Sequence, residues 1–285
     1  MSVILNQTEF KLAMTGQWNK AASGWNDSSA VIRPWLFAST QAMLKMAGIV
    51  TGMRVLDVAA GAGDQTLDIA ALVGAAGSVV ATDISPAILE FAKTNALNAG
   101  FENVETVTAD GEALPLEDGT FDAAICRLGL MFLPDPLKGL QEIHRVLKPD
   151  ARLCTLVFSS AETNPCLRIL MSTALEHAGL PPVDPYRPGS LVSLGKPGQL
   201  EGMFMAAGFR NCVTTRVSAP FNLPSAKAYL DFVRSSAAPV MQILARLDVV
   251  AQENAWADME TKLLTFNTAS GWSGPNELLL TTGVK

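Results

Sequence analysis

Short apolar runs alternate with amphipathic stretches through the first half of the chain. Apolar runs bounded by glycine or acidic residues are typical of buried parallel strands, and apolar positions at helical spacing indicate the helices that connect them. The strands predicted in this way are residues 55–58, 78–83, 104–108, 121–126 and 153–158, with helices at residues 66–73, 86–98 and 141–147. This alternation predicts an α/β fold with a mostly parallel sheet.

The second half of the chain has a less regular pattern. Residues 160–200 are rich in proline, residues 199–207 are typical of a helix, and residues 212–217 of a sixth strand. An apolar stripe at helical spacing runs through residues 225–264, and residues 277–283 form a closing strand. We therefore expect an N-terminal helical lid (1–50), a core (51–220) with a substrate-facing insertion (160–200), a helical cap (221–274) and a closing strand of the core (275–285).

Composition narrows the class of protein. The 285 residues are 49% hydrophobic, which is enough for one large domain or a domain with a cap. The net charge is −6, and the 21 Lys and Arg residues form no cluster, so nucleic acid is not expected as a partner. No apolar run is long enough for a membrane span, and the four cysteines form no C-x-x-C pair. We expect a cytoplasmic protein with reduced thiols and no metal site, and the sequence leaves a homodimer open.

A glycine turn follows the first predicted strand, where Gly61 and Gly63 precede a predicted helix. Such a turn lets a ligand approach the backbone, and the helix N-terminus adds amide donors. The dinucleotide fingerprint G-x-G-x-x-G is incomplete because Thr66 replaces the third glycine. Asp57 and Asp64 would repel a pyrophosphate but suit a cationic ligand. The charges favour S-adenosylmethionine, which carries an ammonium and a sulfonium, over a nicotinamide cofactor.

Acidic residues also end the second and third predicted strands. Asp83 lies about twenty residues beyond the glycine turn, where a carboxylate accepts from both ribose hydroxyls in nucleotide-binding folds of this kind. Asp110 is placed to accept from an adenine amino group, with the Gly111 amide beside the ring. Arg127 leaves the fourth strand at its carboxyl end, and the sequence does not decide whether it faces substrate or lines the rim.

An ordered set of motifs covers residues 50–158 and resembles class I S-adenosylmethionine-dependent methyltransferases of the ubiquinone/menaquinone-biosynthesis C-methyltransferase type. The motifs are Val55-Leu-Asp-Val-Ala-Ala-Gly-Ala-Gly63, Asp83-Ile-Ser85, Ala109-Asp-Gly-Glu-Ala-Leu-Pro115, Phe121-Asp-Ala-Ala-Ile-Cys-Arg127 and Arg145-Val-Leu-Lys-Pro149. The resemblance implies a Rossmann-like seven-stranded sheet in the order 3-2-1-4-5-7-6. Two positions depart from the pattern: Ala59 replaces a frequent first glycine, and Asp150 replaces a glycine after Pro149.

The resemblance also implies roles for individual residues. The methionine part of the cofactor is expected near Asp57, Ala59, Gly61 and Gly63 and near the backbone of Arg127 and Leu128. Asp83 is expected to bind the ribose, Ile84 and Gly111 to flank the adenine, and Asp110 to hold its amino group.

The function that follows is methyl transfer from S-adenosylmethionine to a carbon or oxygen of a small, largely apolar metabolite. A quinone, phenol, polyketide or terpenoid of secondary metabolism is expected. A cyclisation or rearrangement in the same pocket is the alternative, and a nicotinamide oxidoreductase is disfavoured by the missing glycine. Among candidate general bases, His177 stands in the variable segment and is weighed against a purely structural role, with Tyr186 weaker.

Overall fold

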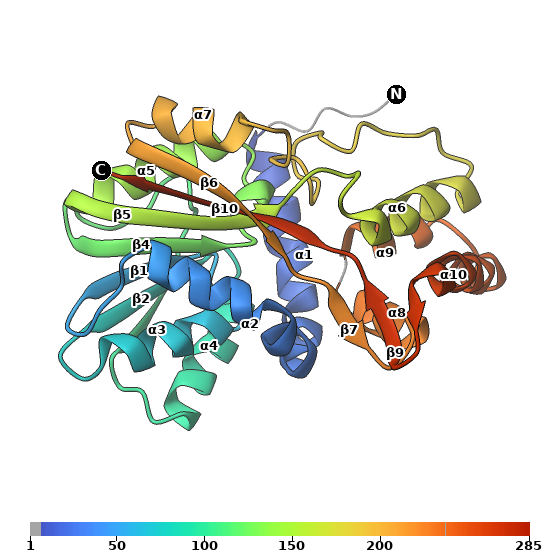
Figure 1. Ribbon diagram of the computed structural model, residues 1–285, viewed down its shortest axis with the longest axis horizontal. Helices are drawn as coiled ribbons and strands as arrows, with labels where there is room; N and C mark the ends of the chain where they lie inside the picture. The colour runs from blue at the N-terminus through green and yellow to red at the C-terminus, as the bar shows by residue number, and fades with distance from the viewer. Residues whose placement is uncertain (1–6, 237) are drawn as a thin grey trace.

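A seven-stranded sheet in the order β3-β2-β1-β4-β5-β10-β6 forms the centre of the core (Figure 1). The computed structural model describes residues 7–236 and 238–285. The strands are β1 (Arg54–Val58), β2 (Ser78–Asp83), β3 (Val104–Thr108), β4 (Phe121–Arg127), β5 (Leu147–Phe158), β6 (Arg210–Ser218) and β10 (Glu277–Val284). β1 pairs parallel with β2 and β4, and β10 pairs antiparallel with β5 and β6. Because β10 is the seventh strand of this sheet, the order 3-2-1-4-5-7-6 is confirmed.

Helices cover both faces of the sheet, which explains why its central strands are apolar throughout. α2 (Ser29–Met46), α3 (Asp64–Val73) and α4 (Pro86–Asn98) pack side by side, and α5 (Pro136–Val146) packs with α7 (Gln199–Ala206) across the sheet from them (Figure 1). A short 3-10 helix, η1 (Leu130–Phe132), follows β4. Val55 and Leu56 of β1 and Ile125 of β4 are fully buried between these layers.

Two element boundaries differ from the prediction. α5 begins at Pro136, five residues before the predicted start, because Asp135 caps it by accepting from the backbone N–H of Lys138 at 3.1 Å. β5 begins at Leu147, well before the predicted residue 153, and includes Pro149 and Asp150. Asp150 takes a φ of 63°, so it adopts the left-handed conformation that favours glycine.

The cap lies at one end of the sheet and has its own apolar core (Figure 1). Residues 221–274 contribute β7 (Phe221–Leu223), α8 (Ala226–Ser236), α9 (Ala238–Leu244), α10 (Val249–Leu263), η2 (Leu264–Phe266), β8 (Asn267–Thr268) and β9 (Gly271–Gly274). α6 (Pro165–His177), from the segment expected as an insertion of the core, packs into the same apolar core and is counted with the cap from here on. The sequence predicted helices alone between residues 221 and 274. The three-stranded sheet β7-β9-β8 was missed because its strands, of two to four residues, are too short to show an alternating pattern.

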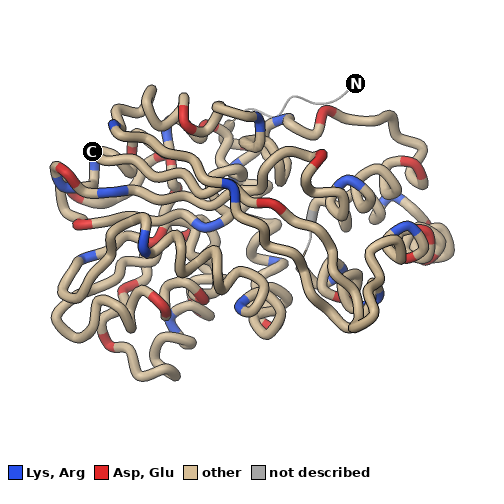
Figure 2. The backbone as a smooth tube through the Cα atoms, viewed as in Figure 1, with Lys and Arg blue, Asp and Glu red and all other residues tan. Residues whose placement is uncertain are grey.

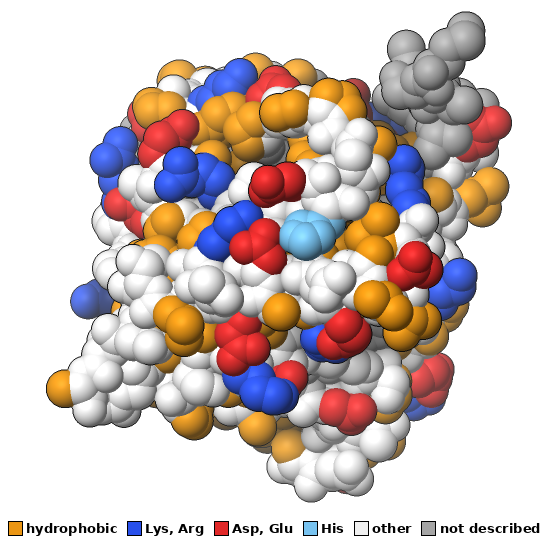
Figure 3. All heavy atoms as spheres, turned by 90° about the vertical axis from the view of Figure 1, so that its right-hand side faces the viewer, with side chains coloured by type: hydrophobic (Ala, Val, Ile, Leu, Met, Phe, Trp, Pro, Cys, Tyr) orange, Lys and Arg blue, Asp and Glu red, His pale blue; other side chains and the backbone are white. Residues whose placement is uncertain are grey.

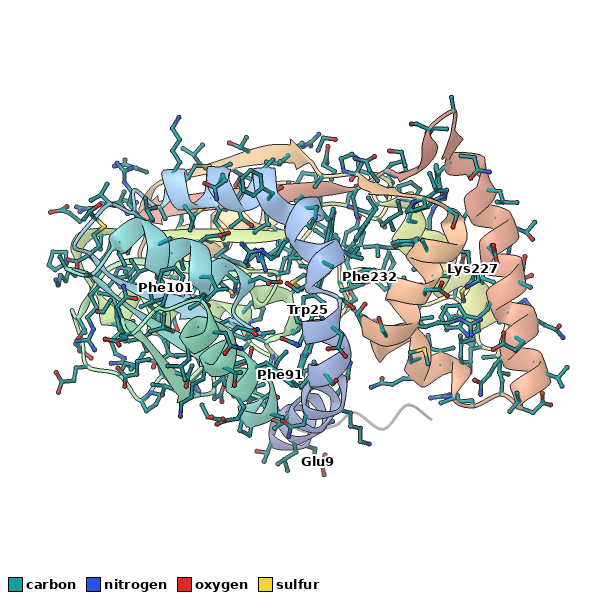
Figure 4. The ribbon with its side chains drawn as sticks, turned by 90° about the horizontal axis from the view of Figure 1, so that it is seen from below. Glu9, Trp25, Phe91, Phe101, Lys227 and Phe232 are labelled. Atoms are coloured by element: carbon teal, nitrogen blue, oxygen red, sulfur yellow. The ribbon has the colours of Figure 1, made fainter. Side chains whose placement is uncertain are left out.

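The N-terminal helix α1 (Gln7–Asp27) runs between core and cap and packs against α4 and α8 (Figure 4). Helical structure was predicted for residues 1–50, of which residues 1–6 lie outside the described part. Trp35 of α2 also joins the two halves, because its Nε1 donates to the carbonyl oxygen of Ala219 at 2.8 Å. The space between core and cap is therefore enclosed by α1 and α2 as well.

Charged residues are interspersed along the chain, with acidic and basic residues on the same elements (Figure 2). Within residues 7–236 and 238–285, no helix is both long and apolar enough to cross a bilayer. Cys126 and Cys154 are buried in β4 and β5, as their apolar sequence context predicted, and all four cysteines are free thiols.

Candidate functional site

A pocket opens where the carboxyl ends of four parallel strands meet α1 and the cap. On the core side it is lined by residues 58–61, 82–84, 109–111 and 127–129, which follow or end β1, β2, β3 and β4. Open α/β sheets bind ligands at this edge because successive loops diverge there. All the residues predicted to bind the cofactor line this pocket except Asp57 and Gly63.

The loop after β1 is held against the end of β2 by backbone hydrogen bonds. The Ala60 N–H donates to the Thr82 carbonyl oxygen at 2.9 Å, and the Gly61 N–H donates to Asp83 Oδ2 at 3.1 Å. Ala59 and Gly61 take φ values of 55° and 59°, in the left-handed region that only glycine enters without strain. The structure therefore keeps a sharp turn at Ala59 although the side chain is not that of glycine.

Asp83 lies half-buried at the end of β2, in the wall of the pocket. Its Oδ1 accepts from the Ser85 N–H at 2.9 Å, while its Oδ2 accepts from Gly61. Each carboxylate oxygen has two lone pairs, so both can accept a second donor from a ligand. Burial raises the pKa of this carboxyl to about 6, against the lowering effect of the backbone donors.

Asp110, Ile84 and Gly111 lie along the same wall, as expected for one end of a nucleotide site. Asp110 Oδ2 is 2.6 Å from Lys11 Nζ, and its Oδ1 accepts from the Glu112 N–H at 2.9 Å. The same lysine is 2.6 Å from Glu112 Oε2, which is fully buried. Lys11 was missed from sequence because no motif marks a contact between residues that are 99 positions apart.

Asp57 and Gly63 stand beside the pocket and not among its lining residues. Asp57 is fully buried and accepts from Thr66 Oγ1 at 2.6 Å and Gln65 Nε2 at 3.2 Å, so its carboxylate holds the start of α3. Burial raises its pKa to about 6. A Cβ at Gly63 would lie 3.0 Å from the Cβ of Ala92, so this glycine permits close packing of α3 against α4. Both residues support the loop from behind.

Arg127 and Leu128 line the pocket at the end of β4. Arg127 is 8% exposed, and its Nη1 donates to Thr40 Oγ1 at 3.0 Å. Burial lowers the pKa of its guanidinium, while the nearby carboxylates of Asp64 and Asp57 act in the opposite direction. The sequence left open which way Arg127 faces, and the structure places it in the pocket wall.

His177 and Tyr186 do not reach the pocket. His177 Nε2 lies 3.1 Å from Asp258 Oδ2, where α6 packs on α10, and the same carboxylate pairs with Lys262. Figure 3 shows this outer end of the molecule, where acidic and basic side chains gather beside small apolar patches. The Tyr186 hydroxyl donates to Glu162 Oε2 at 3.0 Å. The geometry therefore does not support the expected role of His177 as a general base.

The cap side of the pocket is mainly apolar and aromatic. Trp35 stacks on Phe221 with a centroid distance of 3.9 Å and an interplanar angle of 21°. Trp25 of α1 and Phe232 of α8 approach the junction from the two sides (Figure 4). The tryptophans of the predicted lid thus pack on the core and also line the pocket. The cap residues were missed because an apolar stripe at helical spacing does not show which positions face a cavity.

The fold and the arrangement of this edge define a Rossmann-like class I methyltransferase architecture. Residues 35–175 match the ubiE/COQ5 methyltransferase family. The ubiquinone/menaquinone biosynthesis C-methyltransferase UbiE of Hahella chejuensis is 41% identical over 119 residues, which are 41% of this chain and 47% of that protein. UbiE of Escherichia coli O1:K1 is 42% identical over 119 residues, with the same coverage. The chain matches about half the length of these relatives.

The shared fold extends beyond the matched segment. The crystal structure of the YcgJ protein from Bacillus subtilis superposes with a TM-score of 0.60 and 21% identity, covering 87% of this chain and 98% of that one. At this identity the likeness shows the fold alone.

Proposed function

We propose that this chain is an S-adenosylmethionine-dependent methyltransferase acting on a small, largely apolar metabolite. The observation that carries the proposal is the division of one pocket into two parts. Carboxylates and backbone amides at the strand ends line one part, and aromatic and aliphatic side chains of the cap line the other. A charged nucleoside donor and an apolar acceptor require these two environments side by side.

The core side fits the donor residue by residue. Asp83 keeps lone pairs for the ribose hydroxyls, Ile84 offers an apolar surface to the adenine, and Asp110 with Gly111 borders its polar edge. A Cβ at Gly61 would lie 3.3 Å from Nε1 of Trp25, so an added side chain would press on the indole that covers the loop. These residues support the expected binding roles, and the loop at 127–129 borders the same space.

When bound, S-adenosylmethionine supplies a methyl group that is already activated by the sulfonium. The chain then has to align the acceptor and exclude water, because the transfer needs no nucleophile from the protein. α1 and the cap serve this purpose by covering the strand ends with Trp25, Trp35 and Phe232. The apolar lining supports an acceptor of the quinone, phenol, polyketide or terpenoid type, methylated at carbon or oxygen.

Two finer points belong to the same proposal. The four free cysteines support a reducing compartment such as the cytoplasm. The expected alternative, a cyclisation or rearrangement without methyl transfer, gains no support from the curated relatives, which carry methyltransferase names. We therefore retain methyl transfer as the proposed reaction.

Calorimetry with S-adenosylhomocysteine and NADH tests the donor assignment directly. We expect the purified chain to bind S-adenosylhomocysteine in the micromolar range and NADH not at all. Incubation with methyl-labelled S-adenosylmethionine and a panel of quinols and phenols should then yield labelled product. Binding of NADH without S-adenosylhomocysteine would refute the proposal, and donor binding with an unlabelled, rearranged product would replace methyl transfer by the cyclisation alternative.

A further inference from the structure

The cap side of the pocket contains few polar atoms among the described residues. Only Tyr229 and Ser236 are polar among the side chains that α6, β7, α8 and α9 contribute to its lining. The Ser236 hydroxyl donates to the carbonyl oxygen of Phe232 at 2.6 Å, one turn back along α8. Its proton is therefore already used within the helix.

Tyr229 is 1% exposed and lines the pocket, and none of the hydrogen bonds among residues 7–236 and 238–285 involves its hydroxyl. Its oxygen is not among the fully buried side-chain atoms that lack a partner, so it keeps contact with solvent and can bond a water or a ligand. Burial and the neighbouring Cys166 raise the pKa of this phenol well above 10, so it remains a neutral donor.

The position of the Tyr229 ring is fixed by its neighbours. Trp272 stacks on it at a centroid distance of 4.9 Å and 24°, and Phe221 lies at 5.2 Å. The Trp272 indole is itself held by a hydrogen bond from Nε1 to the Leu263 carbonyl oxygen at 2.7 Å. A donor held rigidly on an apolar wall selects for a ligand with one polar atom at a fixed place.

We propose that the Tyr229 hydroxyl positions the methyl acceptor by hydrogen bonding to an oxygen substituent on the ring of the acceptor. The inference rests on the proposed function and adds a specificity-determining residue to it. The acceptor is then a flat, apolar ring compound whose hydroxyl or carbonyl faces α8, and a hydrocarbon of the same shape should bind less tightly.

The test compares 1-naphthol with naphthalene as probes, titrated by ligand-observed NMR against the full chain with S-adenosylhomocysteine present. We expect wild type to favour 1-naphthol about threefold to tenfold, which is the value of one hydrogen bond. Tyr229→Phe, which removes only the hydroxyl, should abolish this preference while S-adenosylhomocysteine binding and the melting temperature stay within error. Tyr186→Phe is the matched control, since it removes a phenolic hydroxyl outside the pocket.

Loss of the preference in Tyr229→Phe but not in Tyr186→Phe supports the inference. The inference is overturned if Tyr229→Phe keeps the preference for 1-naphthol. It is also overturned if wild type shows no preference or binds neither probe, which includes the case in which a bound water satisfies the hydroxyl. Wild type alone can refute the inference, so it stays testable even if the variant folds poorly. Failure of S-adenosylhomocysteine to bind would overturn the proposed function. This outcome can be told apart from failure of the inference, because the ratio of the two probe affinities is also measured without S-adenosylhomocysteine.

Discussion

The Gly61 backbone N–H donates to Oδ2 of Asp83, so the loop after β1 is anchored to the carboxylate that ends β2. The two residues are 22 positions apart and come from neighbouring parallel strands. One carboxylate thereby fixes the loop and also faces the pocket. Substitutions of Asp83 should therefore affect both the shape of the loop and the binding of the donor.

We expect Asp83→Ala to weaken S-adenosylhomocysteine binding by about 10-fold to 150-fold, the range for hydrogen bonds to a charged group. The variant loses the acceptor for the ribose hydroxyls and the anchor of the Gly61 N–H. Calorimetry measures the change. Asp231→Ala is the matched control, because Asp231 is an exposed carboxylate that pairs with Lys227 on the outside of α8. Equal affinity of the Asp83 variant and the control would contradict the ribose assignment.

The affinity for S-adenosylhomocysteine should depend on pH through Asp83. Burial raises the pKa of this carboxyl to about 6, so the carboxylate becomes protonated as pH falls below that value. Hydroxyls donate more strongly to an ionised carboxylate, and we expect binding to weaken by up to about tenfold per pH unit below about pH 6. Asp83→Asn should remove this dependence of the affinity on pH. Asp57 also titrates near pH 6, so Asp57→Asn should leave the profile in place if Asp83 causes it.

The same pKa shift has the opposite sign for folding. The carboxyl pKa of Asp83 is raised from 3.8 to about 6 in the folded chain. Between these two pH values the folded state therefore holds a proton that the unfolded chain has released. The contribution of this group to the free energy of unfolding is therefore largest below about pH 4 and declines as pH rises to about 6. Urea unfolding measures this at pH 4.5 and 6.5. The free energy of unfolding should decline less between these two pH values in Asp83→Asn than in wild type.

Gly129→Ala should destabilise the chain by about 1–3 kcal/mol, as expected for overpacking. A Cβ at residue 129 would lie 2.3 Å from the Cβ of Ala59 and 3.1 Å from Sγ of Cys126, so the two loops at the pocket would be forced apart. Urea unfolding measures the loss, and donor affinity should fall with it. Gly202→Ala is the control: this glycine lies within α7 with no atom near the added Cβ, and the variant should gain up to about 1 kcal/mol.

His177→Ala should leave both donor affinity and methyl-transfer turnover unchanged. Its ring pairs with Asp258 between α6 and α10 and does not line the pocket. The partners are a quarter to a third exposed, so we expect a loss of stability below about 1 kcal/mol. A changed pH profile for turnover in this variant would show that His177 takes part in the reaction after all.

Much of the core could be predicted because parallel strands bring distant residues to one edge. Asp83 and Arg127 each end a recognisable strand and Asp110 lies two residues beyond another, and so they meet at the pocket although no short motif contains all three. Asp57 shows the limit of this argument. It too lies near a strand end, but side chains alternate between the faces of a strand, and this carboxylate points to α3 and away from the pocket.

The acceptor side could not be predicted, for a physical reason. Tyr229 and Phe232 belong to a stripe that is apolar at helical spacing, and such a stripe is equally compatible with a solid core and with the wall of a cavity. The position of Lys11 depends on where α1 crosses the strand ends, which is set by the packing of α1 against α4 and α8. The residue pattern gives no signal for a contact of that kind.

The chain leaves the sheet after Ser218 and returns at Glu277, and these two residues are direct partners in the pairing of β6 with β10. The departing and returning segments are also joined by a hydrogen bond from the Ala219 N–H to the Asn276 carbonyl oxygen at 2.9 Å. Everything between them can therefore vary in length and composition without disturbing strand registry. Grafting the intervening stretch from another member of the fold should exchange the part of the pocket wall that β7, α8 and α9 form, while the loops at the strand ends stay as they are.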